Sequence, residues 1–527
     1  MTELTGTWAL VRFVVRRDRV RILVWVAAIV VLVVSTAAST KGLFPTQADL
    51  DEAAAASEDN AAAIAFNGPA VALDTIGGQV AFQVGTFGLI VVGLMSLFTV
   101  GRLTRAEEES GRADLVRSMA VGRHAPTAAA LVVAAGMSVV VGIVVGLGLL
   151  SQDLPAGGSL VLGASFTAMG LVFAAIALVA AQVTENTRVV SGISGAVLGA
   201  AFVLRAAGDV GVGTLSWLSP IGWSQKTRPY AGDLWWPLLV SLVATAGLAV
   251  VAGVLTARRD VGAGLVPPRP GPPVAGAGLA HPLGLAVRLQ RGSLVAWAAG
   301  VLLVGVSYGS VANDVEDFVG DNEALADMIA QSGGASLTDS FLATTQLMLA
   351  LIGAGFAVQA ALRLRSEEGG LRAEPLLATP VSRWRWAASH LVVAWVGAVI
   401  VLVMGGLGSG VTYAIVADDA GGAPRLVGAA LAYAPAVWLL VAVVVLLFGL
   451  LPRGALLAWS ALALCFVVAL LGEVFDFPTW VSDASPFQHI PQMPVADLDL
   501  APLAVLTALA AALTWVGLTG FRQRDVG

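Results

Sequence analysis

The sequence predicts an all-α polytopic membrane protein with about twelve transmembrane helices, arranged as two parallel repeats of six helices. Three observations support this fold class. Of the 527 residues, 57% are hydrophobic and the mean hydropathy is +0.85, whereas the apolar share of a soluble protein is about 45–50%. The apolar residues gather in runs of 18 or more, long enough to cross the roughly 30 Å hydrocarbon core as helices. One charged passage also occurs twice, 260 positions apart.

The apolar runs predict six spans in each half of the chain. The first span follows the arginine-rich stretch RFVVRRDRVR, which has no small-residue cleavage site, so we interpret it as a retained helix rather than a signal peptide. The predicted spans are 22–42, 79–101, 126–150, 158–182, 188–206 and 233–256, then 293–311, 341–362, 387–414, 426–451, 455–472 and 501–520.

Basic residues predict the orientation, because short loops rich in Lys and Arg stay in the cytoplasm. If both termini and every second loop, including 102–125 and 363–386, lie inside, then 24 of the 29 Lys and Arg residues are cytoplasmic. We therefore expect a multi-pass protein of the cell membrane with both termini in the cytoplasm.

Metal and cysteine chemistry are poorly supported by the sequence. Cys465 is the sole cysteine, which excludes an intramolecular disulfide and a cysteine-based zinc site. The four histidines lie at 124, 281, 390 and 489, without metal-ligand spacing. No nucleophile stands near a base. We expect no metal, no cofactor and no catalytic residue in this chain.

The repeated passage predicts a tandem duplication. RAEEESGRADLVRSMAVGR at 105–123 aligns without a gap with RSEEGGLRAEPLLATPVSR at 365–383, and LVVA at 131–134 meets LVVA at 391–394 at the same offset. RRDVG at 258–262 is echoed by RQRDVG at 522–527. We divide the chain into a first half 1–262, a Pro- and Gly-rich linker 263–280 and a second half 281–527. Because each half has an even number of spans, the halves are predicted to be parallel.

Each charged loop is a candidate docking element, because its acids precede its arginines as a helix dipole favours. We expect a short amphipathic helix after Gly101. A solvated loop that obeys the basic-inside rule would explain the arginines but not the paired acids. The candidate docking residues are Glu107, Glu108, Arg112, Asp114 and Leu115 in the first loop and Glu367, Glu368, Arg372, Glu374 and Leu376 in the second.

The amino-terminal stretch predicts an interfacial helix. Arg12, Arg16 and Arg19 recur at helical spacing, with Trp8 on a neighbouring face, so such a helix would lie in the headgroup plane before turning into the bilayer. The alternative is a frayed basic end that only sets topology.

This layout resembles the membrane domain of an ABC-2-type exporter, and more narrowly the duplicated twelve-span permeases for polyketide antibiotics, which include tetronasin-transport proteins. The specific motif is EEESGRADLVRSMAVGR. The second copy departs from it, with Leu371 in place of Gly111 and Pro375 in place of Leu115.

The resemblance implies that a separate ABC ATPase, in two copies, binds loops 102–125 and 363–386 and drives export of hydrophobic compounds such as antibiotics, drugs or lipids. ATP and Mg²⁺ would then be held by that partner. The chain itself has no G-x-x-x-x-G-K-[ST] motif, and Lys41 and Lys226 are its only lysines. We expect no role in nucleic-acid binding.

In families of this shape the second and fifth spans of each half line the pathway. Carried over by position, this nominates aromatic and other adaptable side chains, although each taken singly is better explained by helix packing or lipid contact. They are Phe82, Phe87, Met95, Phe98 and Phe202 in the first half and Phe341, Gln346, Met348, Phe356 and Phe466 in the second.

The main alternative is a proton-coupled secondary multidrug transporter. Such a carrier needs ionisable groups at membrane depth. The predicted spans place none at a helix centre, since Arg205 and Glu473 are expected near outer ends, where they would reach water. The outer segments 43–78 and 312–340 are predicted to form short helices.

Overall fold

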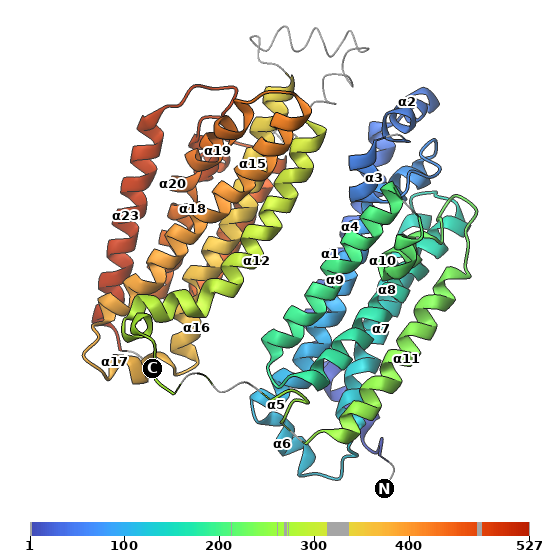
Figure 1. Cartoon of the computed structure of the whole chain (residues 1–527), viewed down its shortest axis with the longest axis horizontal. Coiled ribbons are helices and arrows are strands. Elements are labelled where there is room, and N and C mark those ends of the chain that lie inside the picture. The colour runs from blue at the N-terminus through green and yellow to red at the C-terminus, as the bar shows by residue number, and fades with distance from the viewer. Residues whose placement is uncertain are drawn as a thin grey trace. The chain divides into compact units, whose positions relative to one another are not determined.

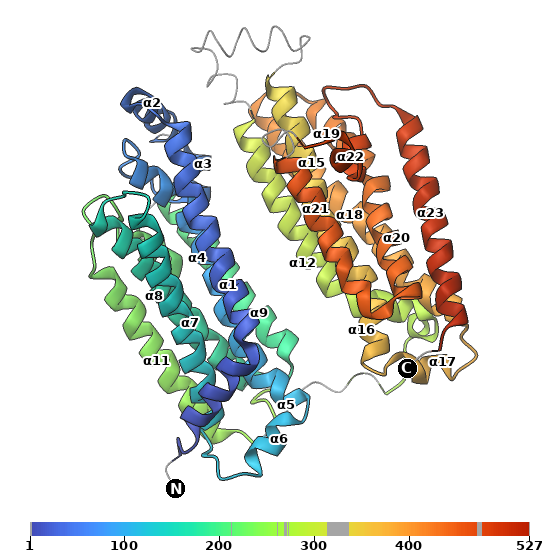
Figure 2. The same ribbon diagram turned by 180° about the vertical axis from the view of Figure 1, so that it is seen from behind.

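The computed structural model describes residues 3–58, 60–211, 213–260, 262–267, 271, 273–312, 337–471 and 477–525. Within these ranges the chain forms helices and no β-strand. It divides into two compact units, Met1–Pro270 and Gly271–Gly527, which are described separately below (Figures 1 and 2).

Twelve helices in the described part of the chain are long and apolar enough to cross a membrane, and each predicted span corresponds to one of them. They confirm the all-α polytopic fold. In unit 1 they are α1 (Thr7–Leu43), α4 (Ile76–Gly101), α7 (Ala125–Leu150), α8 (Ala156–Val183), α9 (Thr187–Val210) and α11 (Pro237–Arg258). In unit 2 they are α12 (Pro282–Val311), α15 (Leu337–Ala361), α18 (Arg383–Val416), α19 with α20 (Gly422–Ala432, Ala434–Leu450), α21 (Ala458–Leu471) and α23 (Leu500–Gln523).

Short helices cover the end of unit 1 that is opposite to its charged loop (Figure 1). They are α2 (Gln47–Glu58) and α3 (Ala61–Asn67), which confirm the short helices predicted for 43–78. The prediction for 312–340 falls mostly on residues 313–336, outside the described ranges. The remaining short helices are η2 (Leu215–Leu218), α10 (Pro220–Gln225), η3 (Ala277–Ala280), η4 (Pro452–Leu457), α22 (Thr479–Asp483) and η5 (Pro486–His489).

Helix α1 is longer than a simple span. Its 37 residues form one unbroken helix, about 55 Å long at 1.5 Å per residue, so the arginine-rich stretch and the first span share a single element. Figure 2 shows that this helix bends near its amino end. The headgroup-plane position predicted for residues 7–21 stays a prediction.

Small residues allow the helices of unit 1 to pack closely. Gly142 of α7 lies against Gly163 and Thr167 of α8, and a Cβ atom at Gly142 would overlap the Gly163 carbonyl. Glycine at such crossings lets two backbones approach, which is the usual packing solution for membrane helices. This contact fixes the α7–α8 pair, and α7 begins directly after the first charged loop.

Candidate functional site

The first charged loop begins as a continuation of a span. Helix α4 runs past Gly101 through the π-helical turn η1 (Arg102–Ala106) into α5 (Glu107–Glu109). The chain turns at Ser110 and Gly111, and α6 (Arg112–Arg117) follows. The expectation of a single short helix after Gly101 is therefore wrong: the acids extend the span, because neither Gly nor Pro lies between Gly101 and Gly111.

The second charged loop has the same plan. The helix α16 (Arg363–Gly369) carries its acids, and α17 (Ala373–Leu377) follows the turn. Gly111 has φ +72° and Leu371, its counterpart, has φ +56°. Both residues thus have a left-handed backbone conformation. For Leu371, whose side chain begins with a Cβ atom, this conformation costs about 1–2 kcal/mol.

The side chain of Glu108 is almost fully enclosed and binds Arg259, the residue that directly follows the sixth span of unit 1. Arg259 donates to its two carboxylate oxygens at 2.8 and 3.1 Å, and Arg105 donates at 2.6 Å. The side chains of all three are at most 9% exposed. Arg259 also donates to Gln182 Oε1 at 2.6 Å and to the Ala263 carbonyl at 3.0 Å. A carboxylate this enclosed is stabilised only by such complete pairing.

Glu368 of unit 2 repeats this arrangement. Arg524 donates to its two carboxylate oxygens at 2.6 and 2.8 Å, and Glu368 is 3% exposed. Arg365 lies 3.7 Å away, a looser partner than its counterpart Arg105. The Arg524 guanidinium also lies over the rings of Phe448 and Phe521, at 4.9 and 5.1 Å from their centroids.

A second arginine in each loop binds the segment that directly follows the sixth span, which we call the tail. Arg123 donates to the backbone carbonyl of Arg259 at 2.9 Å, and Arg383 donates to that of Arg524 at 2.6 Å. Each loop is therefore bonded at both of its ends to the chain that leaves the sixth span. In unit 1 the tail continues along α8, where the amides of Leu265 and Val266 donate to the carbonyls of residues 182 and 183. The first residues of the predicted linker thus pack on unit 1.

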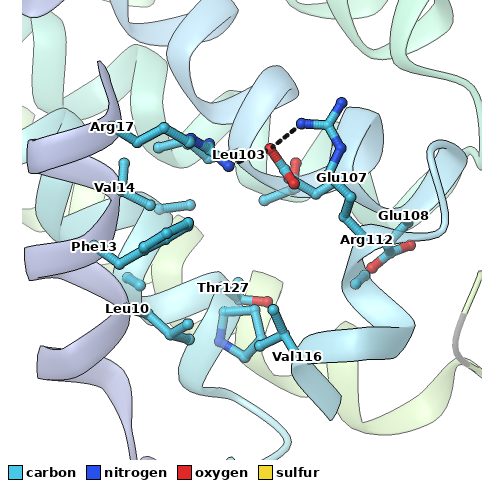
Figure 3. A pocket seen from close by; sticks show the side chains of 15 residues that line it. Leu10, Phe13, Val14, Arg17, Leu103, Glu107, Glu108, Arg112, Val116 and Thr127 are labelled. Carbon is cyan, nitrogen blue, oxygen red and sulfur yellow. Dashed lines mark ion pairs between the residues drawn. The ribbon is translucent and has the colours of Figure 1, made fainter. Parts of the chain in front are cut away.

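Glu107 and Glu367 have different partners. Glu107 lies 3.0 Å from Arg17 of α1 and 3.8 Å from Arg112 (Figure 3). Glu367 pairs with Arg363 at 2.6 Å and Arg372 at 3.0 Å, both within its own loop. Only the first loop is therefore held to the amino-terminal helix by its first acid.

An apolar pocket of about 690 Å³ separates α1 from the first charged loop. Leu10, Phe13 and Val14 of α1 face Val116 and Thr127 across it, and the Arg17–Glu107 pair lies beside them (Figure 3). Asp18, one residue further along α1, forms an ion pair with Arg102. The loop can therefore move against α1 only if these contacts change.

Most of the other candidate docking residues are exposed. Leu115 is 72% exposed, and Asp114 and Glu374 are exposed as well. Leu376 is half-buried and packs on the core of unit 2. Asp114, Leu115 and Glu374 are thus exposed on the charged loops, while the carboxylates of Glu108, Glu367 and Glu368 are at most 9% exposed.

The predicted interfacial residues Trp8, Arg12, Arg16 and Arg19 are all exposed on α1. The arginine of this helix that contacts a charged loop is Arg17, which the helical spacing did not single out.

The structure brings few of the candidate pathway residues together; in unit 1, Phe87 and Phe202 both contact Phe66, with ring centroids 6.0 and 5.9 Å from it. Phe87 and Phe98 are exposed, at 43% and 46%, whereas Met95 and Phe356 are fully buried. Gln346 donates to Ser409 at 2.9 Å in the core of unit 2. Phe82 lies against Leu73 and Phe341 lies 6.2 Å from Tyr308, whereas Met348 and Phe466 are half-buried against the unit 2 core that also contains Phe356.

The expectation that Arg205 reaches water is wrong. Its side chain is fully buried, and it donates to the carbonyls of Ile64 and Phe66 at 3.1 Å while pairing with Asp209 at 3.6 Å. The short helix α3 covers it, and no pattern in the sequence indicates that α3 folds onto α9. Glu473 lies outside the described residues.

Sequence reasoning missed Arg105, Arg123, Arg259, Arg383 and Arg524 as parts of the site. A signal was present, because the echoed tails around Arg259 and Arg524 recur together with the echoed loops. Two repeats that recur together are candidates for contact, although their spacing along the chain does not show which atoms meet. Among the described residues, no group of three His, Cys, Asp or Glu could hold a metal ion.

The chain is 44% identical over 525 residues to the multidrug efflux system permease protein Rv1217c of Mycobacterium tuberculosis, and the alignment covers 99% of this chain and 95% of that protein. The chain belongs to the Rv1217c family. A family model described as the C-terminal domain of multidrug efflux system permease Rv1217c matches residues 279–522. As a member of the Rv1217c family with twelve apolar helices, the chain is a multi-pass membrane permease for drug efflux.

Proposed function

We propose that this chain is the membrane subunit of an ABC-2-type exporter, of the duplicated form seen in tetronasin-type permeases, and that its two halves are parallel repeats. Two copies of a separate ABC ATPase bind loops 102–125 and 363–386 at the cytoplasmic face, where both termini also lie. The partner holds ATP and Mg²⁺, and the complex exports hydrophobic compounds.

One observation carries this proposal. The Glu108–Arg259 and Glu368–Arg524 pairs are both bidentate, their carboxylates are at most 9% exposed, and each connects a charged loop to the end of the sixth span of its own unit. A loop that served only to satisfy the basic-inside rule would not need a buried carboxylate. A loop that receives force from outside must be joined firmly to a span.

The division between inward and outward side chains suggests separate roles. Leu115, Asp114 and Glu374 are exposed and form the surface that a partner would touch. Glu108 and Glu368 bind their own tails and act as positioning residues. The docking role first expected for Glu108, Glu367 and Glu368 is therefore indirect, through the shape of the loop.

The test is co-purification of the chain with a candidate ABC ATPase from the same organism. We expect Leu115→Asp and Asp114→Lys to reduce ATPase association at least roughly ten-fold, the effect of losing about 1.4 kcal/mol at an interface. Glu52→Lys is the matched control, because Glu52 is an exposed acid at the opposite end of unit 1 (Figure 1). Unchanged association of both loop variants would contradict the docking assignment.

A transport assay in vesicles separates this proposal from the proton-coupled alternative. An ABC exporter moves its compound only when the ATPase and ATP are present, and it continues after the proton gradient is collapsed. Export that persists without the ATPase and stops with the gradient would contradict the proposal.

A further inference from the structure

A groove of about 1210 Å³ lies at the loop-bearing end of unit 2. Three segments line it: the first turns of α12, the α15–α16 junction, and η4 with the start of α21. Arg363, Arg365 and Arg453 all contribute to its wall. The groove is separate from the outward surface of α17, which belongs to the charged loop.

Positive charge exceeds negative charge around this groove. Glu367 and Glu368, the acids nearest to it, are already shared among Arg363, Arg365, Arg372 and Arg524. Arg453 is exposed and forms no ion pair with any residue that the structure describes. The groove therefore presents guanidinium groups whose charge the protein does not balance.

A neutral donor adds to this wall. Gln359 uses its side-chain oxygen to accept a 2.7 Å hydrogen bond from Trp297, which leaves its amide nitrogen as the donor on the groove side. Arginine forks and amide donors are the groups that bind phosphate oxygens. The lining thus suits a phosphate group.

The rim of the groove is apolar. Leu456 and Leu457 are 66% and 62% exposed, and Trp459 is 40% exposed. In a membrane protein, exposed leucines at the end of a span contact acyl chains, and tryptophan lies at the level of the headgroups. Cations beside lipid-facing leucines fit an amphiphile better than a free inorganic anion.

Unit 1 does not repeat the lining of this groove. At the offset shared by the two charged loops, Leu103 stands in place of Arg363 and Thr99 in place of Gln359. Arg105, which stands in place of Arg365, is fully buried, whereas the Arg365 side chain is 36% exposed, so the open basic groove is a feature of unit 2.

We propose that this groove binds the phosphate headgroup of an anionic phospholipid, with Arg365 and Arg453 as its main ligands and the leucines of η4 against its acyl chains. Basic pockets at the ends of membrane helices are the usual sites for such headgroups. The inference depends on the chain spanning a membrane and does not depend on a partner ATPase.

Native mass spectrometry of the full chain in detergent tests this proposal with phosphatidylglycerol, phosphatidylcholine and inorganic phosphate as probes. We expect phosphatidylglycerol to bind at least ten-fold more tightly than phosphatidylcholine. Arg453→Gln should weaken phosphatidylglycerol binding roughly 5-fold and Arg365→Gln/Arg453→Gln roughly 25-fold, from the usual contribution of one arginine at an anionic surface. Arg188→Gln, an exposed arginine in the corresponding loop of unit 1, is the control and should change it less than 2-fold.

Arg453→Gln keeps the test decisive if the double variant does not fold, because Arg453 supports no ion pair with a described residue. Equal binding of the two lipids would overturn the proposal, as would unchanged binding in Arg453→Gln. Displacement of phosphatidylglycerol by millimolar inorganic phosphate would show a small-anion site instead of a lipid site. Loss of ATPase association with unchanged lipid binding would assign the groove to the protein partner and would also overturn it.

Discussion

Glu108 and Arg259 are 151 positions apart, yet each carboxylate oxygen of Glu108 accepts a hydrogen bond from one of the two terminal nitrogens of Arg259. The pair joins the end of α4 to the end of α11 across the charged loop. Because Arg259 also donates to Gln182 and to the Ala263 carbonyl, each of its three guanidinium nitrogens has at least one hydrogen-bond partner. We therefore expect any movement of the loop to shift the end of the sixth span as well.

We predict that Glu108→Ala destabilises unit 1 by about 3–5 kcal/mol, because two arginines are left without their buried carboxylate. Thermal unfolding in detergent measures this loss. Asp114→Ala removes an exposed acid from the same loop and should change stability by less than about 0.5 kcal/mol. Equal effects of the two variants would show that the buried pair has no special role.

The corresponding arginine in unit 2 is expected to resist even a conservative change. Arg524→Lys keeps the charge but loses the two-nitrogen contact with Glu368 and the stacking on Phe448 and Phe521, a cost of about 2 kcal/mol. The exposed Arg522 provides the control, since Arg522→Lys should be nearly neutral. An Arg524→Lys variant with the same melting temperature as the wild-type protein would contradict the bidentate contact.

Substitutions at the two turn residues, Leu371 and Gly111, should change stability in opposite directions. Leu371→Gly should stabilise unit 2 by about 0.5–1 kcal/mol, because glycine adopts a positive φ without strain. Gly111→Ala should destabilise unit 1 by about 1 kcal/mol, because alanine is strained at a positive φ. No atom lies within 4 Å of the added Cβ atom, so a steric clash does not contribute. Melting temperatures that shift in the same direction would contradict the shared turn geometry.

Close packing of α7 on α8 predicts a sharp difference between two glycines of one helix. Gly142→Ala forces the backbones apart and should cost about 1–3 kcal/mol, whereas Gly136→Ala meets no atom within 4 Å and should be neutral or slightly stabilising. Thermal unfolding of both variants provides the measurement. Comparable losses in the two variants would contradict the assignment of the Gly142 effect to contact with α8.

The candidate pathway residues can be sorted by burial. Phe356→Ala should destabilise unit 2 by about 3–5 kcal/mol, because Phe356 is fully buried in its core. Phe98→Ala should leave stability within about 0.5 kcal/mol, so a change in its export rate would report on the pathway itself. A large stability loss in Phe98→Ala would assign this side chain to packing.

The spans could be predicted from the sequence because a bilayer imposes one length and one polarity on every crossing helix. The duplicated loops could also be found, since charged residues are rare in this chain and recur at one offset. Both features depend on local composition, which a single sequence contains in full.

The direction of each charged side chain could not be predicted in this way. Glu108 and Asp114 lie six positions apart in one polar loop, yet the first is buried and the second is exposed. The difference arises from Arg259, which follows four intervening spans. Arg205 was misplaced for the same reason, because the carbonyls that bury it belong to α3, far away in the chain.

The most direct test of the account is the amount of compound exported per ATP hydrolysed by the reconstituted complex carrying Glu108→Gln. Glutamine keeps the shape of the side chain and weakens its bond to Arg259, so the ATPase should stay bound and active while export per ATP falls at least roughly ten-fold. Unchanged export per ATP, with the ATPase still bound, would contradict the claim that this pair transmits movement from the loop to the sixth span.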